Sequence, residues 1–176
     1  MSSEPGPPVI YSIGHSRHPL EDFVSLLKKH AIEKVVDVRG QPYSRRFSQY
    51  NRERLRISLE SCGIGYAWQG DFLSGRPKPM KFYGADGKVL WEELRKWPAL
   101  HQALDELVED AGDQRLAMMC AEEDPDRCHR RFLLTPPLLE RGVTIRHIRG
   151  DGRLENENDI RKDGGPDQMD LFARRG

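Results

Sequence analysis

The chain alternates short runs rich in β-branched residues with segments of helical spacing, and this alternation constrains the fold more than any other feature. The runs predict buried strands at 7–14, 32–40, 64–70, 114–123 and 143–148. The helical spacing predicts helices at 19–30, 51–64, 89–97, 98–112 and 124–142. Strands that alternate with helices form parallel sheets covered on both faces. We therefore predict one three-layer α/β domain with about five mostly parallel strands and helices on both faces.

Composition sets the expected domain limits. Residues 8–150 hold every predicted element and form the α/β domain, whereas 1–7 are expected to be disordered and 151–176 to form a flexible, polar tail. The Gly- and Pro-rich segment 71–88 predicts an irregular loop that is a candidate lid. A chain of 176 residues can bury a core without disulfides or metals.

The sequence also carries an expectation about location. No apolar run approaches the roughly 20 residues of a membrane span, so we expect no membrane role. The first residues lack the basic and apolar regions of a secretory signal, and three cysteines cannot all pair with one another. We expect a cytoplasmic protein with reduced thiols.

Polar residues follow three of the predicted strands. They are Gly14, His15 and Ser16 after the first, Asp37 and Arg39 at the second, and Cys120, Glu122, Cys128, His129 and Arg130 at and after the fourth. Ligands of open α/β sheets bind beyond the carboxyl ends of the strands, so we expect these residues to converge on one site. Any one of them alone is more often a cap or a hydrogen-bonded turn residue, and only their convergence indicates function.

The segments YSIGHS, VVDVRGQPYS, CGIGYAWQGDFLSGR and MCAEEDPDRCHRRFL resemble the domain of unknown function 488 family, over about residues 11–148. The resemblance implies a small α/β domain with the motif residues at its site. In this chain they are Gly14, His15, Ser16, Asp37, Arg39, Pro42, Ser44, Cys120, Glu122, Cys128, His129 and Arg130. The segment FLSGRP has Ser74 where a further glycine is expected. A family without a defined function leaves the reaction open, and the cofactor is unknown.

From these residues we predict a catalytic set and a binding set. The catalytic set is His15, Asp37, Arg39 and Glu122; Glu122 stands nearer the loop than Cys120 and suits acid–base or nucleophilic work. The substrate-binding set is Gly14, Ser16, Tyr43, Ser44, Arg45, Arg46, Cys120, Cys128, His129 and Arg130.

Cys120 allows a second interpretation, as the nucleophile of a rhodanese-like sulfur-transfer or redox enzyme. It precedes a predicted helix, whose N–H groups lower the pKa of a thiol. The acids that follow, Glu122, Glu123 and Asp124, act in the opposite direction and repel anionic substrates. A small buried hydrophobe is an equally good account of Cys120.

Metal binding is a further possibility that the spacing does not favour. Cys120, Cys128, His129 and His147 carry suitable ligand atoms. Adjacent residues on a helix point about 100° apart, however, and no paired C-x-x-C spacing occurs. We therefore predict no metal site.

The segment 39–56 is locally basic, although the whole chain has a formal net charge of zero. It contains six arginines and one acid, Glu53, with Tyr43, Phe47 and Tyr50 between them. Guanidinium groups suit phosphates, and aromatic faces suit unstacked bases, so the segment predicts a nucleic-acid surface. A solvated helix face with a loop is the alternative.

The pentapeptide Gln168-Met169-Asp170-Leu171-Phe172 resembles the motif by which bacterial replication and repair proteins dock on the DNA polymerase sliding clamp. The Leu-Phe pair would fill an apolar pocket and Gln168 would hydrogen-bond at its rim. A short amphipathic end that folds back on the domain is the alternative.

Together these features predict a nucleic-acid- or nucleotide-processing hydrolase of DNA metabolism or repair, recruited through the sliding clamp. Recruitment compensates for the missing net positive charge. Hydrolysis at a phosphodiester or an N-glycosidic bond fits equally well. The alternatives are sulfur transfer through Cys120 and a non-enzymatic DNA-associated adaptor.

Overall fold

The computed structural model describes residues 6–162, and the strands in this part of the chain form one six-stranded sheet. The strands are β1 (Val9–Gly14), β2 (Lys34–Asp37), β3 (Gly65–Trp68), β4 (Leu116–Cys120), β5 (Thr144–Ile148) and β6 (Leu154–Asn156). Their order is β3-β2-β4-β1-β5-β6, and only β6 pairs antiparallel with its neighbour. The predicted α/β class with a mostly parallel sheet is confirmed.

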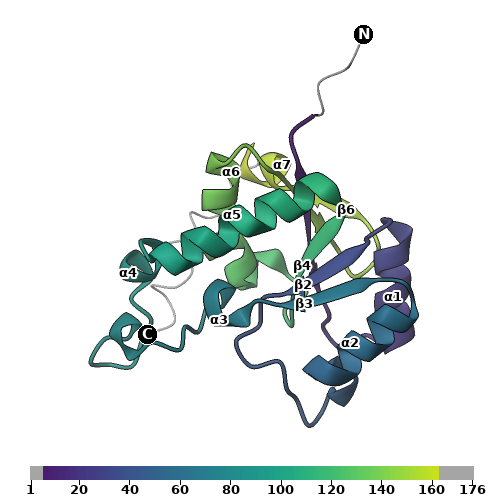
Figure 1. Ribbon diagram of the computed structural model, residues 1–176, viewed down its shortest axis with the longest axis horizontal. Coiled ribbons are helices and arrows are strands. Elements are labelled where there is room, and N and C mark those ends of the chain that lie inside the picture. Colours follow the sequence, from purple (N-terminus) through teal and green to yellow (C-terminus); the bar gives the residue numbers. More distant parts are fainter. Residues whose placement is uncertain (1–5, 163–176) are drawn as a thin grey trace.

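Helices lie on both faces of this sheet, as Figure 1 shows. They are α1 (Leu20–Lys29), α2 (Arg52–Ser61), α3 (Gly70–Leu73), α4 (Trp91–Arg95), α5 (Pro98–Asp113), α6 (Thr135–Glu140) and α7 (Glu157–Lys162). One core joins the sheet to α1 and α2, and a second joins its other face to α5 and α6. Side chains alternate between these cores along each strand: Leu116 and Met118 of β4 enter the second core, and Ala117 and Met119 the first.

The segment 124–142 was predicted to be one helix, and this prediction is wrong. The structure has a 3₁₀ turn, η3 (Pro125–Arg127), a π-helical turn, η4 (Arg130–Leu134), and then α6. Between the two turns Cys128 is extended, with φ −125° and ψ 141°. Pro136 and Pro137 have no N–H group to bond the carbonyls of Phe132 and Leu133, which explains why η4 does not continue as a regular α-helix into α6.

The segment expected to be a flexible tail from residue 151 also differs. Strand β6 pairs with β5, and α7 follows directly. The reason is Glu157, which is buried and hydrogen-bonds to Arg131 and to the ring of His147. The contacts that order this polar segment come from residues far back in the chain.

The segment 71–88 is less irregular than predicted, because it includes most of α3 and a 3₁₀ turn, η2 (Met80–Phe82). Tyr83 also forms an isolated antiparallel bridge with Val89. No helix within residues 6–162 is long and apolar enough to span a bilayer.

Candidate functional site

The candidate site lies at the carboxyl ends of β2 and β4. The chain leaves β2 toward α2 on one face of the sheet and leaves β4 toward α6 on the other, so a crevice opens where the two connections part. A cavity of about 530 Å³ occupies this position. Its wall includes five of the predicted residues, Arg39, Cys120, Glu122, Cys128 and His129.

Asp37 and Arg39 form a closed ion pair at the end of β2. The Arg39 guanidinium donates to both carboxylate oxygens of Asp37, at 2.9 Å from Nε and 2.7 Å from Nη2. The Arg39 backbone N–H and the Tyr66 hydroxyl also donate to this carboxylate, which is 0% exposed. Asp37 therefore does not line the cavity. It can act on a bound ligand only by positioning Arg39, which does line it.

His15 is part of the same closed network. Its Nδ1 lies 2.9 Å from the Ser16 carbonyl, which can only accept, so Nδ1 carries the proton and Nε2 accepts from Arg39 Nη1 at 3.2 Å. Burial, reinforced by the charge of Arg39, lowers the pKa of His15 to about 4. The imidazole is neutral near pH 7 with both nitrogens engaged. This geometry favours a positioning role for His15 within the predicted catalytic set.

Tyr50 does not offer a free aromatic face, contrary to the sequence interpretation of the basic segment. Its ring is 0% exposed and stacks on the His15 ring at 4.0 Å between centroids. Its hydroxyl donates to the His18 carbonyl. Tyr50 thus fixes the position of His15 from behind.

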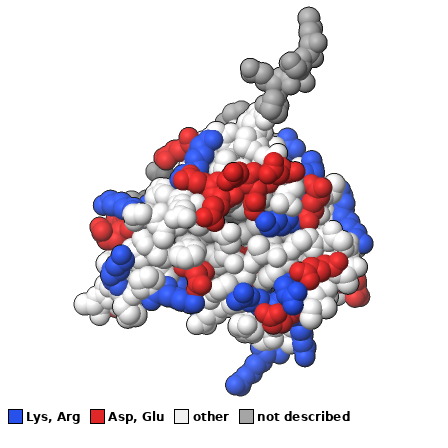
Figure 2. All heavy atoms as spheres, viewed as in Figure 1, with Lys and Arg blue, Asp and Glu red and all other residues white. Residues whose placement is uncertain are grey.

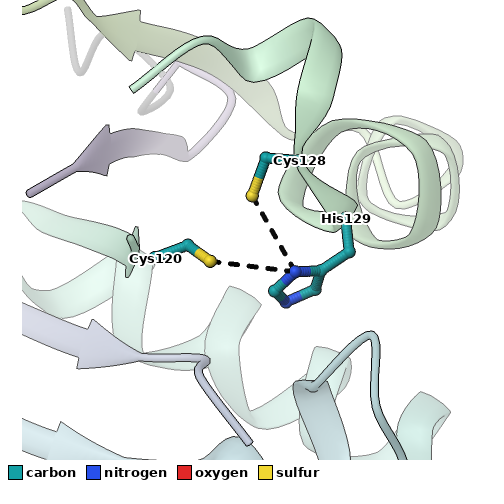
Figure 3. Close-up of side chains that lie close together, drawn as sticks. All are labelled: Cys120, Cys128 and His129. Carbon is teal, nitrogen blue, oxygen red and sulfur yellow. Dashed lines mark hydrogen bonds between the residues drawn. The ribbon is translucent and has the colours of Figure 1, made fainter. Parts of the chain in front are cut away.

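The two cysteines and His129 come together at the end of β4 (Figure 3). Nδ1 of His129 lies 3.9 Å from the Cys120 sulfur and 3.8 Å from the Cys128 sulfur. The expectation that Cys128 and His129 diverge is wrong, because Cys128 is extended rather than helical and its side chain turns toward β4. His129 Nε2 is buried and has no hydrogen-bond partner within the described residues.

The two thiols differ in acidity. The pKa of Cys128 lies well below its ordinary value, because Cys120 donates to its sulfur and the Arg130 and His129 side chains stabilise the thiolate. The pKa of Cys120 is raised well above its ordinary value, because it retains the proton of that hydrogen bond and is buried. Cys128 is therefore the more acidic thiol of the pair, and the structure gives no support to Cys120 as the activated nucleophile.

Arg130 is a buried cation that ties the site together. It donates to the Cys128 sulfur at 3.2 Å, to the Ser12 hydroxyl at 2.6 Å and to the Glu122 carbonyl. Within residues 6–162 no carboxylate forms an ion pair with it, and its charge helps to lower the pKa of Cys128. Arg130 does not itself line the cavity, but it holds two residues that do, Glu122 and Cys128.

Several other predicted binding residues shape the backbone around the site. A Cβ atom on Gly14 would lie 1.8 Å from the Glu122 carbonyl oxygen, so only glycine allows this approach. Ser16 has φ 48° and donates its N–H to Ala121. The Ser44 hydroxyl accepts from the Phe47 N–H and orders the loop between β2 and α2.

That loop carries the predicted nucleic-acid residues outward. Tyr43 is 64% exposed, and Arg45 and Arg46 are exposed as well. Figure 2 shows basic side chains at the lower edge of the view, where Figure 1 places this loop, and a broad acidic patch over α5. The surface charge is therefore strongly uneven.

Sequence reasoning missed part of the cavity wall. Gly75 and Arg76 line it beside Ser74, and Trp91 closes another side. Gly75 packs against His129, because a Cβ there would lie 2.8 Å from the His129 Cβ. In the sequence, the only indication that Gly75 and Arg76 belong to the site was their place in the family-like segment CGIGYAWQGDFLSGR. The clamp-like pentapeptide 168–172 lies outside the described residues.

Comparison with known proteins identifies the family of the chain but not its function. No curated protein and no solved structure shows significant similarity to the chain. The model of the family described as "Domain of unknown function DUF488" matches residues 19–135. This match spans α1 to the start of α6 and includes every residue named above on the cavity wall. The chain therefore belongs to the DUF488 family.

Proposed function

We propose that this protein is a hydrolase that acts on a nucleotide unit of DNA, at a phosphodiester or an N-glycosidic bond. One observation carries the proposal: Glu122, Arg76 and Arg127 line one open cavity. Arg39 adds a third arginine; Asp37 balances its charge, and Arg127 pairs with Asp124 at 3.7 Å. A phosphate is the ligand that such a set of forked donors fits.

Glu122 is the residue that we assign to proton transfer. It is exposed on the cavity, so its carboxylate has access to a substrate and to an attacking water. Its backbone is held by Arg130 at the carbonyl and by the close approach of Gly14. An exposed side chain on a fixed backbone suits a general base that must reach one bond in a bound substrate.

The loop between β2 and α2 supports DNA as the substrate class. Gly40 and Gln41 line the cavity, and the chain continues from them to Tyr43, Arg45 and Arg46. An exposed tyrosine beside two arginines offers stacking for a base and contacts for the backbone. The acidic patch over α5 repels a polyanion, so it favours approach from the loop side.

The test uses end-labelled single-stranded and duplex oligonucleotides. Products are resolved directly, which detects phosphodiester cleavage, and after alkali, which also reveals abasic sites left by N-glycosidic cleavage. We expect product in one of the two analyses, and Glu122→Gln should retain DNA binding but lose turnover. Arg153→Gln is the control, because Arg153 is an exposed arginine outside the cavity wall.

Two results would reject hydrolysis. The first is no product from any substrate, with or without added divalent ions. The second is product that persists unchanged in Glu122→Gln. A cellular phenotype that survives Glu122→Gln but is lost when 166–176 are deleted would favour the adaptor alternative.

We further propose that residues 168–172 recruit the protein to the sliding clamp. The support is the sequence match alone, with Leu171 and Phe172 as the apolar anchor. A labelled peptide of residues 165–176 should bind purified clamp saturably, and the double variant Leu171→Ala, Phe172→Ala should not. Absence of binding at about 100 μM would reject this recruitment.

A further inference from the structure

The cluster formed by Cys120, Cys128 and His129 has the geometry of a metal site. The three candidate ligand atoms all lie within 4.8 Å of one another. With Zn–S near 2.3 Å and Zn–N near 2.0 Å, the sulfur–nitrogen edge of a tetrahedral zinc site is about 3.6 Å. The observed edges of 3.9 Å and 3.8 Å differ from it by a few tenths of an ångström. The third edge, between the two sulfurs, lies within 4.8 Å, against about 3.8 Å in a tetrahedral zinc site, so the ligands enclose an ion once they draw together.

We propose that Cys120, Cys128 and His129 bind one Zn²⁺ ion. Two thiolates and an imidazole form a borderline-soft donor set that selects zinc over magnesium or calcium. Cysteines bind zinc as thiolates, so protons still held by the two thiols are released to solvent on binding, and two thiolates then balance the charge of the ion. Nδ1 of His129 faces both sulfurs, and no contact of Nε2 within the described residues fixes the opposite tautomer.

The surroundings hold these ligands in place. Arg130 donates to the Cys128 sulfur, as outer-shell partners of metal ligands do. Cys120 ends a buried strand, and Gly75 allows the His129 side chain to pack closely against its backbone. The three ligands therefore come from two segments whose separation is set by the sheet and by η3.

Three protein ligands leave the fourth tetrahedral position open, which is the pattern of catalytic rather than structural zinc. All three residues line the cavity that Glu122 also lines. An ion here would make a bound water more acidic, in a cavity that also holds a glutamate able to accept its proton. This consequence rests on the proposed hydrolysis, whereas zinc binding does not.

The test measures metal binding without any substrate, so its failure is separate from a failure of hydrolysis. Reduced, metal-free full-length protein is titrated with Co²⁺ and then with Zn²⁺. We expect one Co²⁺ per chain, with a sulfur-to-cobalt charge-transfer band and intense visible bands of a tetrahedral site, and displacement by one Zn²⁺.

Variants locate the site. Cys120→Ser, Cys128→Ser and His129→Gln should each weaken Zn²⁺ binding by at least about 100-fold, beyond the roughly 10- to 100-fold typical of a lost outer-shell partner. Cys62→Ser is the matched control, because Cys62 is the exposed third cysteine. Circular dichroism of the metal-free variants checks their folding.

A measurement on the unaltered chain covers the case in which a cysteine variant does not fold. Zn²⁺ should protect Cys120 and Cys128 from alkylation, while Cys62 reacts at the same rate with and without the ion. Three results would overturn the proposal: no bound Co²⁺ at micromolar protein, binding unchanged in His129→Gln, or a Cys120–Cys128 disulfide that forms under mild oxidation in a chain that binds no metal. The last would identify a redox pair instead.

Discussion

The corner after β1 and β2 and the corner after β4 lie against the same cavity, yet they are built in opposite ways. Around Asp37 and Arg39, charged groups meet at hydrogen-bond distances and both nitrogens of His15 are engaged. Around Cys120 and His129, the contacts are near 3.9 Å and one ring nitrogen lacks a partner among the described residues. In the first corner, which we call the closed corner, the polar side chains satisfy one another. In the second, which we call the open corner, atoms are left that can bind a ligand.

The strongest way to break the closed corner is Asp37→Asn, which keeps the side-chain shape and removes the charge. The buried Arg39 guanidinium then lacks its counter-charge, and we expect the free energy of unfolding to fall by about 3–5 kcal/mol. Urea denaturation measures this. Asp110→Asn, at a more exposed ion pair with Lys34, should cost less than about 1 kcal/mol. Equal losses would show that the closed corner is not special.

The buried carboxylate of Glu157 tests whether a second set of paired charges, near the end of the described chain, stabilises the fold as Asp37 does. Glu157→Gln should lower the free energy of unfolding by about 3 kcal/mol, less than Asp37→Asn because Arg131 keeps Asp126 as a partner. Burial raises the pKa of Glu157, but the hydrogen bond from His147 and the charge of Arg131 outweigh it and hold the pKa below its ordinary value.

The sign of this shift gives a pH dependence. A depressed carboxylate pKa stabilises the fold above the unfolded pKa of roughly 4.3, and that stability is lost as pH falls through the folded pKa. Urea unfolding between pH 7 and pH 3 should therefore show a steeper decline below about pH 4.3 for the original chain than for Glu157→Gln. Parallel curves would contradict the assignment.

The open corner should respond to zinc instead. Free Zn²⁺ at 100 times its dissociation constant should raise the free energy of unfolding by about 2.7 kcal/mol. His129→Gln should remove this gain and, without metal, should cost less than about 1 kcal/mol, because the ring's hydrogen bonds among the described residues are the long ones to the sulfurs. A large loss in the metal-free variant would mean that this corner is closed too.

The smallest effect on stability is expected in the exposed loop. Arg45→Glu with Arg46→Glu should change the free energy of unfolding by less than about 0.5 kcal/mol. The same change should weaken single-strand binding and flatten its salt dependence. Lys28→Glu with Lys29→Glu changes the net charge equally on exposed positions of α1 and should affect binding less. Equal weakening would assign binding to net charge alone.

The fold class followed from the sequence because buried strands and amphipathic helices each leave a period in the chain. Helix α1 illustrates this, with Phe23 and Leu27 buried one turn apart, acids in its first turn and lysines in its last. The segment 124–142 shows the limit of such a guide. Its apolar residues have a helical period, which reports neither the extended Cys128 between the two turns nor the hydrogen bonds that Pro136 and Pro137 remove.

The candidate site was predicted in its membership more than in its roles. Residues after parallel strands share an edge by topology, which brought Cys120, Glu122 and His129 to one cavity. The role of each residue depends on whether its side chain is buried or exposed. That in turn depends on contacts with residues distant in the sequence. Stacking against Tyr50 and the bond from Arg39 engage His15 on all sides, and no local pattern in the sequence indicates either contact.

Strand β6 is short, but it changes what the sheet presents to its surroundings. It covers the outer edge of β5, and α7 contacts the same strand through the bond between Glu157 and His147. A chain shortened before Leu154 would expose the backbone donors and acceptors of β5 along a free edge. Such an edge pairs readily with other chains, so that truncation should aggregate. A deletion confined to 166–176 leaves β6 and the covered edge of β5 in place. Its effect can therefore be attributed to loss of the tail and not to aggregation.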